Sequence, residues 1–158
     1  MASNLASVPS QASRFLHYSD ARETSALSSV SVLTGRVLFS LIFLLAGPGH
    51  FSHQSIAFAA QQGVPCASLA VPASGVMALL GGLSVLLGYK AKWGAWLLIA
   101  FLIPVTLMLH QFWAVKDPMM VQMQMAMFMK NVSMMGAALL ITQLGAGPLS
   151  LDARHSNR

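Results

Sequence analysis

The chain has 158 residues, of which 56% are hydrophobic and only 8% are charged. A soluble domain carries roughly 25% charged residues. Nine basic and four acidic side chains are too few to cover a soluble globule, so the composition excludes a soluble enzyme and a disordered regulator. The net charge of +5 forms no basic stripe with interleaved aromatic residues, and we expect no nucleic-acid partner. We predict an all-α integral membrane protein embedded in the lipid bilayer.

The first segment, residues 1–31, is polar. It holds nine serines and lacks the long apolar run of a secretory signal peptide. We predict a flexible N-terminal tail over residues 1–31, with room for a short surface helix before the membrane, a membrane domain over residues 32–148 and a short cytoplasmic C-terminal tail over residues 149–158.

Four apolar segments follow the tail. A helix needs roughly 20 residues to cross ~30 Å of hydrocarbon. We predict four transmembrane helices, over about 33–47, 69–88, 93–113 and 119–144. Pro48 and Gly49 end the first helix, while Asp117 and Pro118 supply an N-cap and a first helical residue for the fourth. Between the first two helices, residues 54–62 predict a short helix at the membrane surface.

Prolines and small residues mark the second and third helices. Pro72 suits the first turn of the second helix, and Pro104 predicts a kink in the third. Ser74, Ala78 and Gly82 recur at every fourth position, a spacing that allows close helix contact. The alternative is that this face contacts lipid.

The basic residues predict the orientation of the bundle. With the N-terminus inside, seven of the nine Lys and Arg residues lie on the cytoplasmic side, and Lys116 and Lys130 lie on the outer side. Cytoplasmic loops carry an excess of such residues. We therefore predict that both the N- and C-termini are cytoplasmic.

The predicted spans contain no Asp or Glu. This excludes a proton relay built on membrane carboxylates, and a ferritin-like diiron site, which needs several inward carboxylates. No nucleotide-binding or metalloprotease motif is present, and no nucleophile is paired with a base. We expect a non-catalytic membrane subunit rather than a stand-alone enzyme, with no intrinsic cofactor.

Four polar residues converge near one end of the predicted bundle. His50 and His110 lie near the outer ends of the first and third helices, and Lys130 and Asn131 lie in the outer part of the fourth. Ionisable groups in a membrane are costly and mark functional sites, and a histidine carries protons, donates to a quinone carbonyl or binds a metal. The functional interpretation is a candidate ligand-binding site, with a quinone as a candidate ligand. The alternative is that these are solvated interfacial residues.

Eight of the eleven methionines fall within residues 119–135. Thioethers and imidazoles suit copper, and the candidate copper ligands are His53, Met119, Met123 and Met127. Methionine is also a flexible apolar filler, and the stripe extends most of the way round the helix. Packing or lipid contact is therefore the favoured interpretation, and no metal is expected.

One structural ion pair is predicted at the cytoplasmic side. Arg36 lies near the start of the first helix, and Asp152 directly follows the fourth. A pair between them would fasten the first helix to the last. The alternative is that Arg36 extends to lipid phosphate.

The motifs together resemble the DoxX family of four-helix membrane proteins. The resemblance covers about residues 35–152, and it rests on these segments: Gly35-Arg36-Val37-Leu38, Leu44-Leu45-Ala46-Gly47, Gly63-Val64-Pro65, Leu80-Gly81-Gly82, Leu86-Leu87-Gly88, His110-Gln111-Phe112-Trp113, Phe128-Met129-Lys130-Asn131 with Gly136, and Gly147-Pro148-Leu149-Ser150-Leu151-Asp152. The resemblance implies a bacterial inner-membrane protein. It also implies partners among redox proteins, in thiosulfate-to-quinone oxidation or oxidative stress. Met77 and Ala78 stand where many DoxX members carry a glutamate.

Three hypotheses for the function follow. The first is a subunit that anchors other membrane or redox proteins and presents a quinone or small-anion site at its outer mouth. The second is a homo-oligomeric transporter or channel for a neutral or anionic solute. The third is a structural accessory subunit of a larger membrane assembly.

Overall fold

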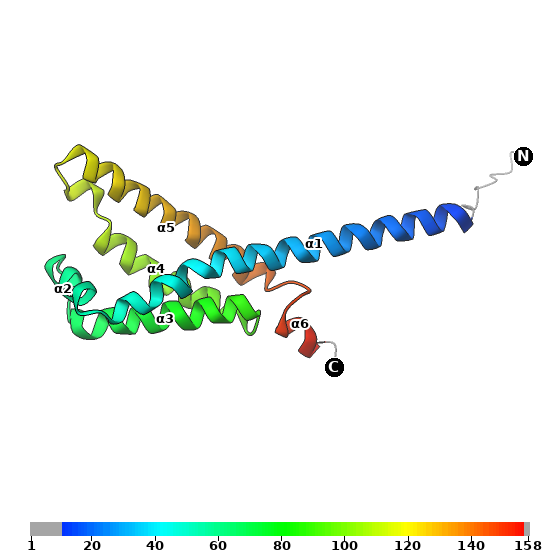
Figure 1. Cartoon of the computed structure of the whole chain (residues 1–158), viewed down its shortest axis with the longest axis horizontal. Coiled ribbons are helices and arrows are strands. Elements are labelled where there is room, and N and C mark those ends of the chain that lie inside the picture. Colours follow the sequence, from blue (N-terminus) through cyan, green and yellow to red (C-terminus); the bar gives the residue numbers. More distant parts are fainter. Residues whose placement is uncertain (1–10, 157–158) are drawn as a thin grey trace, which may run out of the picture.

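The computed structural model describes the backbone of residues 11–156 and the side chains of residues 26–155. Every regular element in that part of the chain is helical (Figure 1). In chain order the elements are α1 (Gln11–Ala46), η1 (Gly47–Phe51), α2 (His53–Gln61), α3 (Ala67–Leu87), α4 (Ala91–Leu109), η2 (Phe112–Ala114), α5 (Pro118–Leu144) and α6 (Leu151–Ser156).

Four helical stretches are long and apolar enough to cross a membrane. They are Ala26–Phe51, Ala67–Leu87, Ala91–Ala114 and Pro118–Leu144. Their positions agree with the four predicted spans. The predicted fold class, an all-α four-helix membrane bundle, is confirmed.

The first helix differs from the expectation of a flexible tail. α1 begins at Gln11 and continues without a break to Ala46, so residues 11–31 are helical. The physical reason is that residues 11–34 contain no Gly or Pro, and glycine and proline are the residues that interrupt a helix most strongly. Residues 1–10 of the predicted tail lie outside the described part of the chain.

Most helix ends lie where the sequence indicates. α1 gives way to η1 at Gly47, which precedes Pro48, and the Asp117 side chain accepts a hydrogen bond from the Met120 N–H, as predicted for an N-cap. Gly88 closes α3 with φ +63°, a left-handed conformation that glycine adopts without steric cost. Pro72 is an exception. It lies inside α3 rather than in its first turn, because that helix begins at Ala67.

The spanning helices pack in chain order and form an open arc. α1 packs on α3, α3 on α4 and α4 on α5, whereas α1 makes almost no contact with α5. Figure 1 shows α1 and α5 spreading apart toward the end of the bundle that carries η1 and α2. We call this end the η1 end, and the opposite end the Arg36 end.

Glycines bring α3 close to both of its neighbours. A Cβ added at Gly81 would lie 2.7 Å from Leu98 and 3.0 Å from the Gly94 carbonyl oxygen. On the side that faces α1, Ala78 and Gly82 are buried, and a Cβ at Gly82 would lie 3.1 Å from the Phe43 Cβ. The small-residue face of this helix therefore packs on α1 rather than on lipid.

Candidate functional site

The four polar residues singled out in the sequence line one cavity at the η1 end. This cavity, which we call the Asn131 cavity, has a volume of about 260 Å³. It is walled by α1, η1, α3, α4 and α5. Its lining residues are Ile42, Phe43, Ala46, His50, Ala78, Phe101, Leu102, Val105, Leu109, His110, Lys130, Asn131 and Met134.

Asn131 is the most deeply buried polar group of the cavity. Its side chain is only 3% exposed and lines the cavity wall. In the described part of the chain, its amide has no hydrogen-bond partner from the protein. A buried polar group without a partner costs roughly 1–3 kcal/mol. The amide is therefore available to a ligand or to water.

Lys130 places a positive charge near the middle of α5, on a side chain that is exposed at the surface of the helix. Twelve residues separate it from Pro118 and fourteen from Leu144, which is about 18 Å and 21 Å at ~1.5 Å per residue. Among residues 26–155 the acids are Asp117 and Asp152, which lie near the two ends of this helix and serve backbone N–H groups. In the described structure, Lys130 therefore has no carboxylate to balance its charge.

The two histidines reach the cavity from η1 and from the C-terminal end of α4. The His110 Nδ1 lies 2.9 Å from the Gln124 Oε1, so this amide fixes the imidazole ring. The His50 Nδ1 lies 3.2 Å from the Ala46 carbonyl oxygen, and its ring stacks edge-on against Phe101 with 5.6 Å between centroids. The remaining nitrogen of each ring is free to act as a hydrogen-bonding group.

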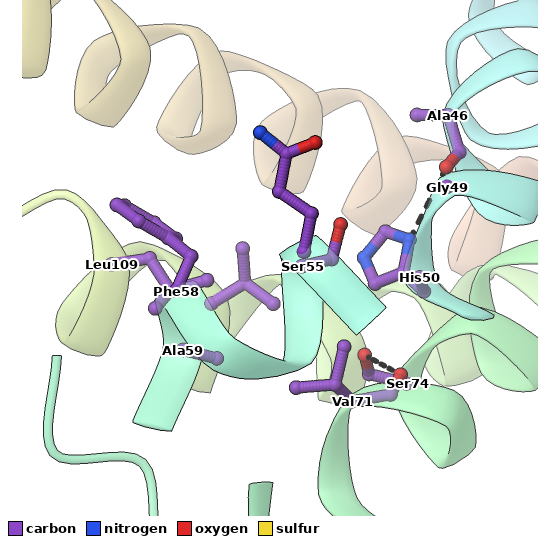
Figure 2. Close-up of a pocket in the computed structure, with 11 residues that line it drawn as sticks. Ala46, Gly49, His50, Ser55, Phe58, Ala59, Val71, Ser74 and Leu109 are labelled. Atoms are coloured by element: carbon purple, nitrogen blue, oxygen red, sulfur yellow. Dashed lines mark hydrogen bonds between the residues drawn. The ribbon is translucent and has the colours of Figure 1, made fainter. Parts of the chain in front are cut away.

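A second cavity adjoins the first at His50. We call it the α2 cavity. It has a volume of about 390 Å³, and Figure 2 shows His50, Ser55, Phe58 and Leu109 around it. Because His50, Ala46, Val105 and Leu109 line both cavities, they form the wall between the two.

Sequence reasoning missed Gln124, the partner of His110. The signal was present, because Gln124 lies seven residues before Asn131, and residues at i and i+7 share one face of a helix. The sequence does not show which polar residue on α4 that face meets, since the pairing depends on how the two helices are rotated.

The copper candidates lie apart from the cavity. Met119 and Met123 are exposed on the surface of α5, at 79% and 47%, and Met127 and His53 are also exposed. Among the described residues, no group of three or more His, Cys, Asp or Glu is placed to hold a metal ion. The exposed thioethers are placed to contact lipid.

Arg36 and Asp152 meet at the Arg36 end, but they do not form a direct ion pair. The Arg36 guanidinium donates to the Ala146 and Leu149 carbonyls at 2.6 and 2.7 Å. The Asp152 carboxylate accepts from the N–H groups of Lys90 and Ala91 at 2.8 and 3.2 Å. The predicted ion pair is replaced by two sets of backbone hydrogen bonds, because the two Nη groups of the guanidinium are already bonded to carbonyls that follow α5. The first helix is still fastened to the last.

Comparison with known proteins assigns the family. The sequence matches the profile of the SURF4 family over residues 5–157. The chain belongs to the SURF4 family. This SURF4-family chain is also 30% identical to the inner membrane protein YphA of Escherichia coli over 131 residues, which cover 82% of the chain and 93% of the relative. No solved structure matches it.

The family assignment corrects the resemblance to DoxX proteins. That prediction is wrong, because the profile that covers nearly the whole chain is that of the SURF4 family, and the relative is not named as a DoxX protein. The short glycine- and leucine-rich segments behind the resemblance are those that close helix packing requires. The predicted location is confirmed: this SURF4-family chain is a multi-pass protein of the inner membrane.

Proposed function

We propose that the chain binds a small molecule in the Asn131 cavity, and that the ligand carries an anionic head group. The observation that carries the proposal is the charge of Lys130, which lies mid-span without a carboxylate among the described residues, beside the unpaired amide of Asn131. A charge in a membrane is costly unless it is paired. An anion would pair with the ammonium group and accept a hydrogen bond from the amide.

The proposal includes an orientation. With both termini in the cytoplasm, as the basic residues predict, the Asn131 cavity faces the outer half of the bilayer. The membrane domain over residues 32–148 and the C-terminal tail over residues 149–158 keep their predicted boundaries as part of this proposal, whereas the N-terminal tail does not, since α1 is helical from Gln11.

A quinone is the second candidate ligand. The cavity offers His50, His110 and Asn131 as possible donors, and donors of this kind suit a carbonyl oxygen. In that case the chain would anchor redox proteins and present the quinone to them. A quinone leaves the charge of Lys130 unpaired, and for this reason we favour the anion.

A transport role receives less support from the packing. Val85, Ala95 and Leu98 have no exposed surface and fill the bundle between the Asn131 cavity and the Arg36 end. A solute path would therefore need more than one copy of the chain. The roles of transporter and of accessory subunit remain predictions.

The test is equilibrium binding to the full chain in nanodiscs, with radiolabelled palmitate and a radiolabelled ubiquinone analogue. We expect palmitate to bind and the Lys130→Gln variant to lose at least about tenfold in affinity, since a hydrogen bond to a charged group contributes roughly 1.5–3 kcal/mol. Lys116→Gln removes an exposed charge outside the cavity and is the matched control. Binding of the quinone alone would shift the assignment to the second candidate, and binding of neither would refute the proposal.

A further inference from the structure

We propose that the ligand of the Asn131 cavity enters from the bilayer between α1 and α5, and that it is a single-chain lipid acid, with one anionic head group on one apolar chain. The inference rests on the proposed function, because it names the source and the class of the ligand for the same site.

The first argument is which helices line the cavity. Its lining comes from α1 through Ile42 and Ala46, and from α5 through Lys130 and Met134. These two helices are the ends of the open arc and make almost no contact with each other, and they spread apart toward the η1 end (Figure 1). In a membrane, an opening between them faces hydrocarbon.

The second argument is the character of the surface beside the opening. Leu38, Leu41 and Leu45 of α1 are exposed, and so are Met127 and Met129 of α5. Such side chains are placed in contact with acyl chains. An apolar chain that leaves the cavity between α1 and α5 would stay among the acyl chains of the bilayer. A free anion that took this route from water would have to cross those acyl chains.

The third argument is the size of the cavity. At about 260 Å³ it is smaller than the roughly 300–1,000 Å³ pockets that enclose a drug-sized ligand. It has room for a head group and the first part of a chain. The remainder of a long chain must lie outside, and between α1 and α5 it would remain within hydrocarbon.

The competing route leads through the α2 cavity, whose lining includes Gln54 and Ser55. His50 lies on the wall between this cavity and Asn131, and its ring is held against Phe101 and the Ala46 carbonyl. A ligand from water would have to displace this ring. A ligand that enters between α1 and α5 would not have to displace it.

The experiment is photoaffinity labelling of the full chain in nanodiscs with a palmitate analogue that carries a diazirine near the end of its chain. We expect the label on peptides that cover residues 38–46 of α1 and residues 127–138 of α5. We also expect an excess of unlabelled palmitate to remove the label, and butyrate at the same concentration to leave it. The Lys130→Gln variant is the control for labelling that does not depend on the site.

Each outcome decides between the hypotheses. A label on α2 and α3 around Phe58 and Val71 would overturn lateral entry and place the chain in the α2 cavity, while leaving the proposed function intact. Competition by butyrate would show that the site takes a free anion from water. Labelling equal in the native chain and the Lys130→Gln variant, together with no equilibrium binding of palmitate, would refute the proposed function itself.

Discussion

Asn131 is the buried polar residue on which the proposed site depends. The residue is 3% exposed and lines the Asn131 cavity. A buried amide that stabilises a fold is paired with another group, and removing such a partner costs roughly 1–3 kcal/mol. Asn131 has no pairing of this kind among the described residues.

We therefore expect Asn131→Leu to weaken ligand binding while leaving the unfolding temperature of the ligand-free chain unchanged or slightly higher. The substitution removes an unpaired amide and adds apolar surface to the bundle. Thermal unfolding in detergent measures the effect. Ala138→Leu, seven residues further along α5 at a site with no exposed surface, is the positive control and should destabilise by about 1–3 kcal/mol. A comparable loss for Asn131→Leu would instead make this residue structural.

At the scale of elements, the glycines of α3 and α4 set how closely these helices approach. A Cβ at Gly94 would clash with the Ser84 side chain and lie 3.1 Å from the Gly81 carbonyl oxygen. Without a hydrophobic force between helices in lipid, close van der Waals contact is a main source of association. The α3–α4 pair carries Ala78, Phe101 and Val105 into the Asn131 cavity, so this contact also shapes the site.

We expect Gly94→Leu to separate α3 from α4 and to lower the unfolding temperature of the chain in detergent. Fitting the larger side chain should cost at least about 1–3 kcal/mol. Gly136→Ala is the control, because a Cβ there meets nothing within 4 Å and alanine is the better helix former by about 1 kcal/mol. The idea fails if Gly94→Leu unfolds at the same temperature as the native chain.

The elements also show what the sequence can predict. Length and hydropathy located the four spans, and Asp117 with Pro118 located the start of α5, because these signals act within one helix. The same local signals brought His50, His110, Lys130 and Asn131 to one end of the bundle. They could not indicate that α1 and α5 stay apart, or that Arg36 takes carbonyls in place of Asp152, since both depend on how separate helices meet.

At the scale of the whole molecule, the open arc is held together at one end. The guanidinium of Arg36 is 5% exposed and donates to Ala146 and Leu149, the segment between α5 and α6. Asp152, just beyond, binds the turn between α3 and α4. These contacts tie α1 to the end of the chain, while the η1 end remains open at the cavity.

We therefore expect Arg36→Gln to release the C-terminal segment. A glutamine amide cannot serve both carbonyls, and each buried group left without a partner costs roughly 1–3 kcal/mol. The chain should lose at least about 2 kcal/mol of stability, and protease should cleave after residue 145 faster than in the native chain. Arg154→Gln makes the same charge change at an exposed position. This control should neither lower the stability nor speed the cleavage. Ligand binding should weaken less than stability falls, because the carbonyls that Arg36 binds lie after α5, at the other end of the bundle from the cavity. Equal protease resistance in the two variants would mean that the bundle closes without Arg36.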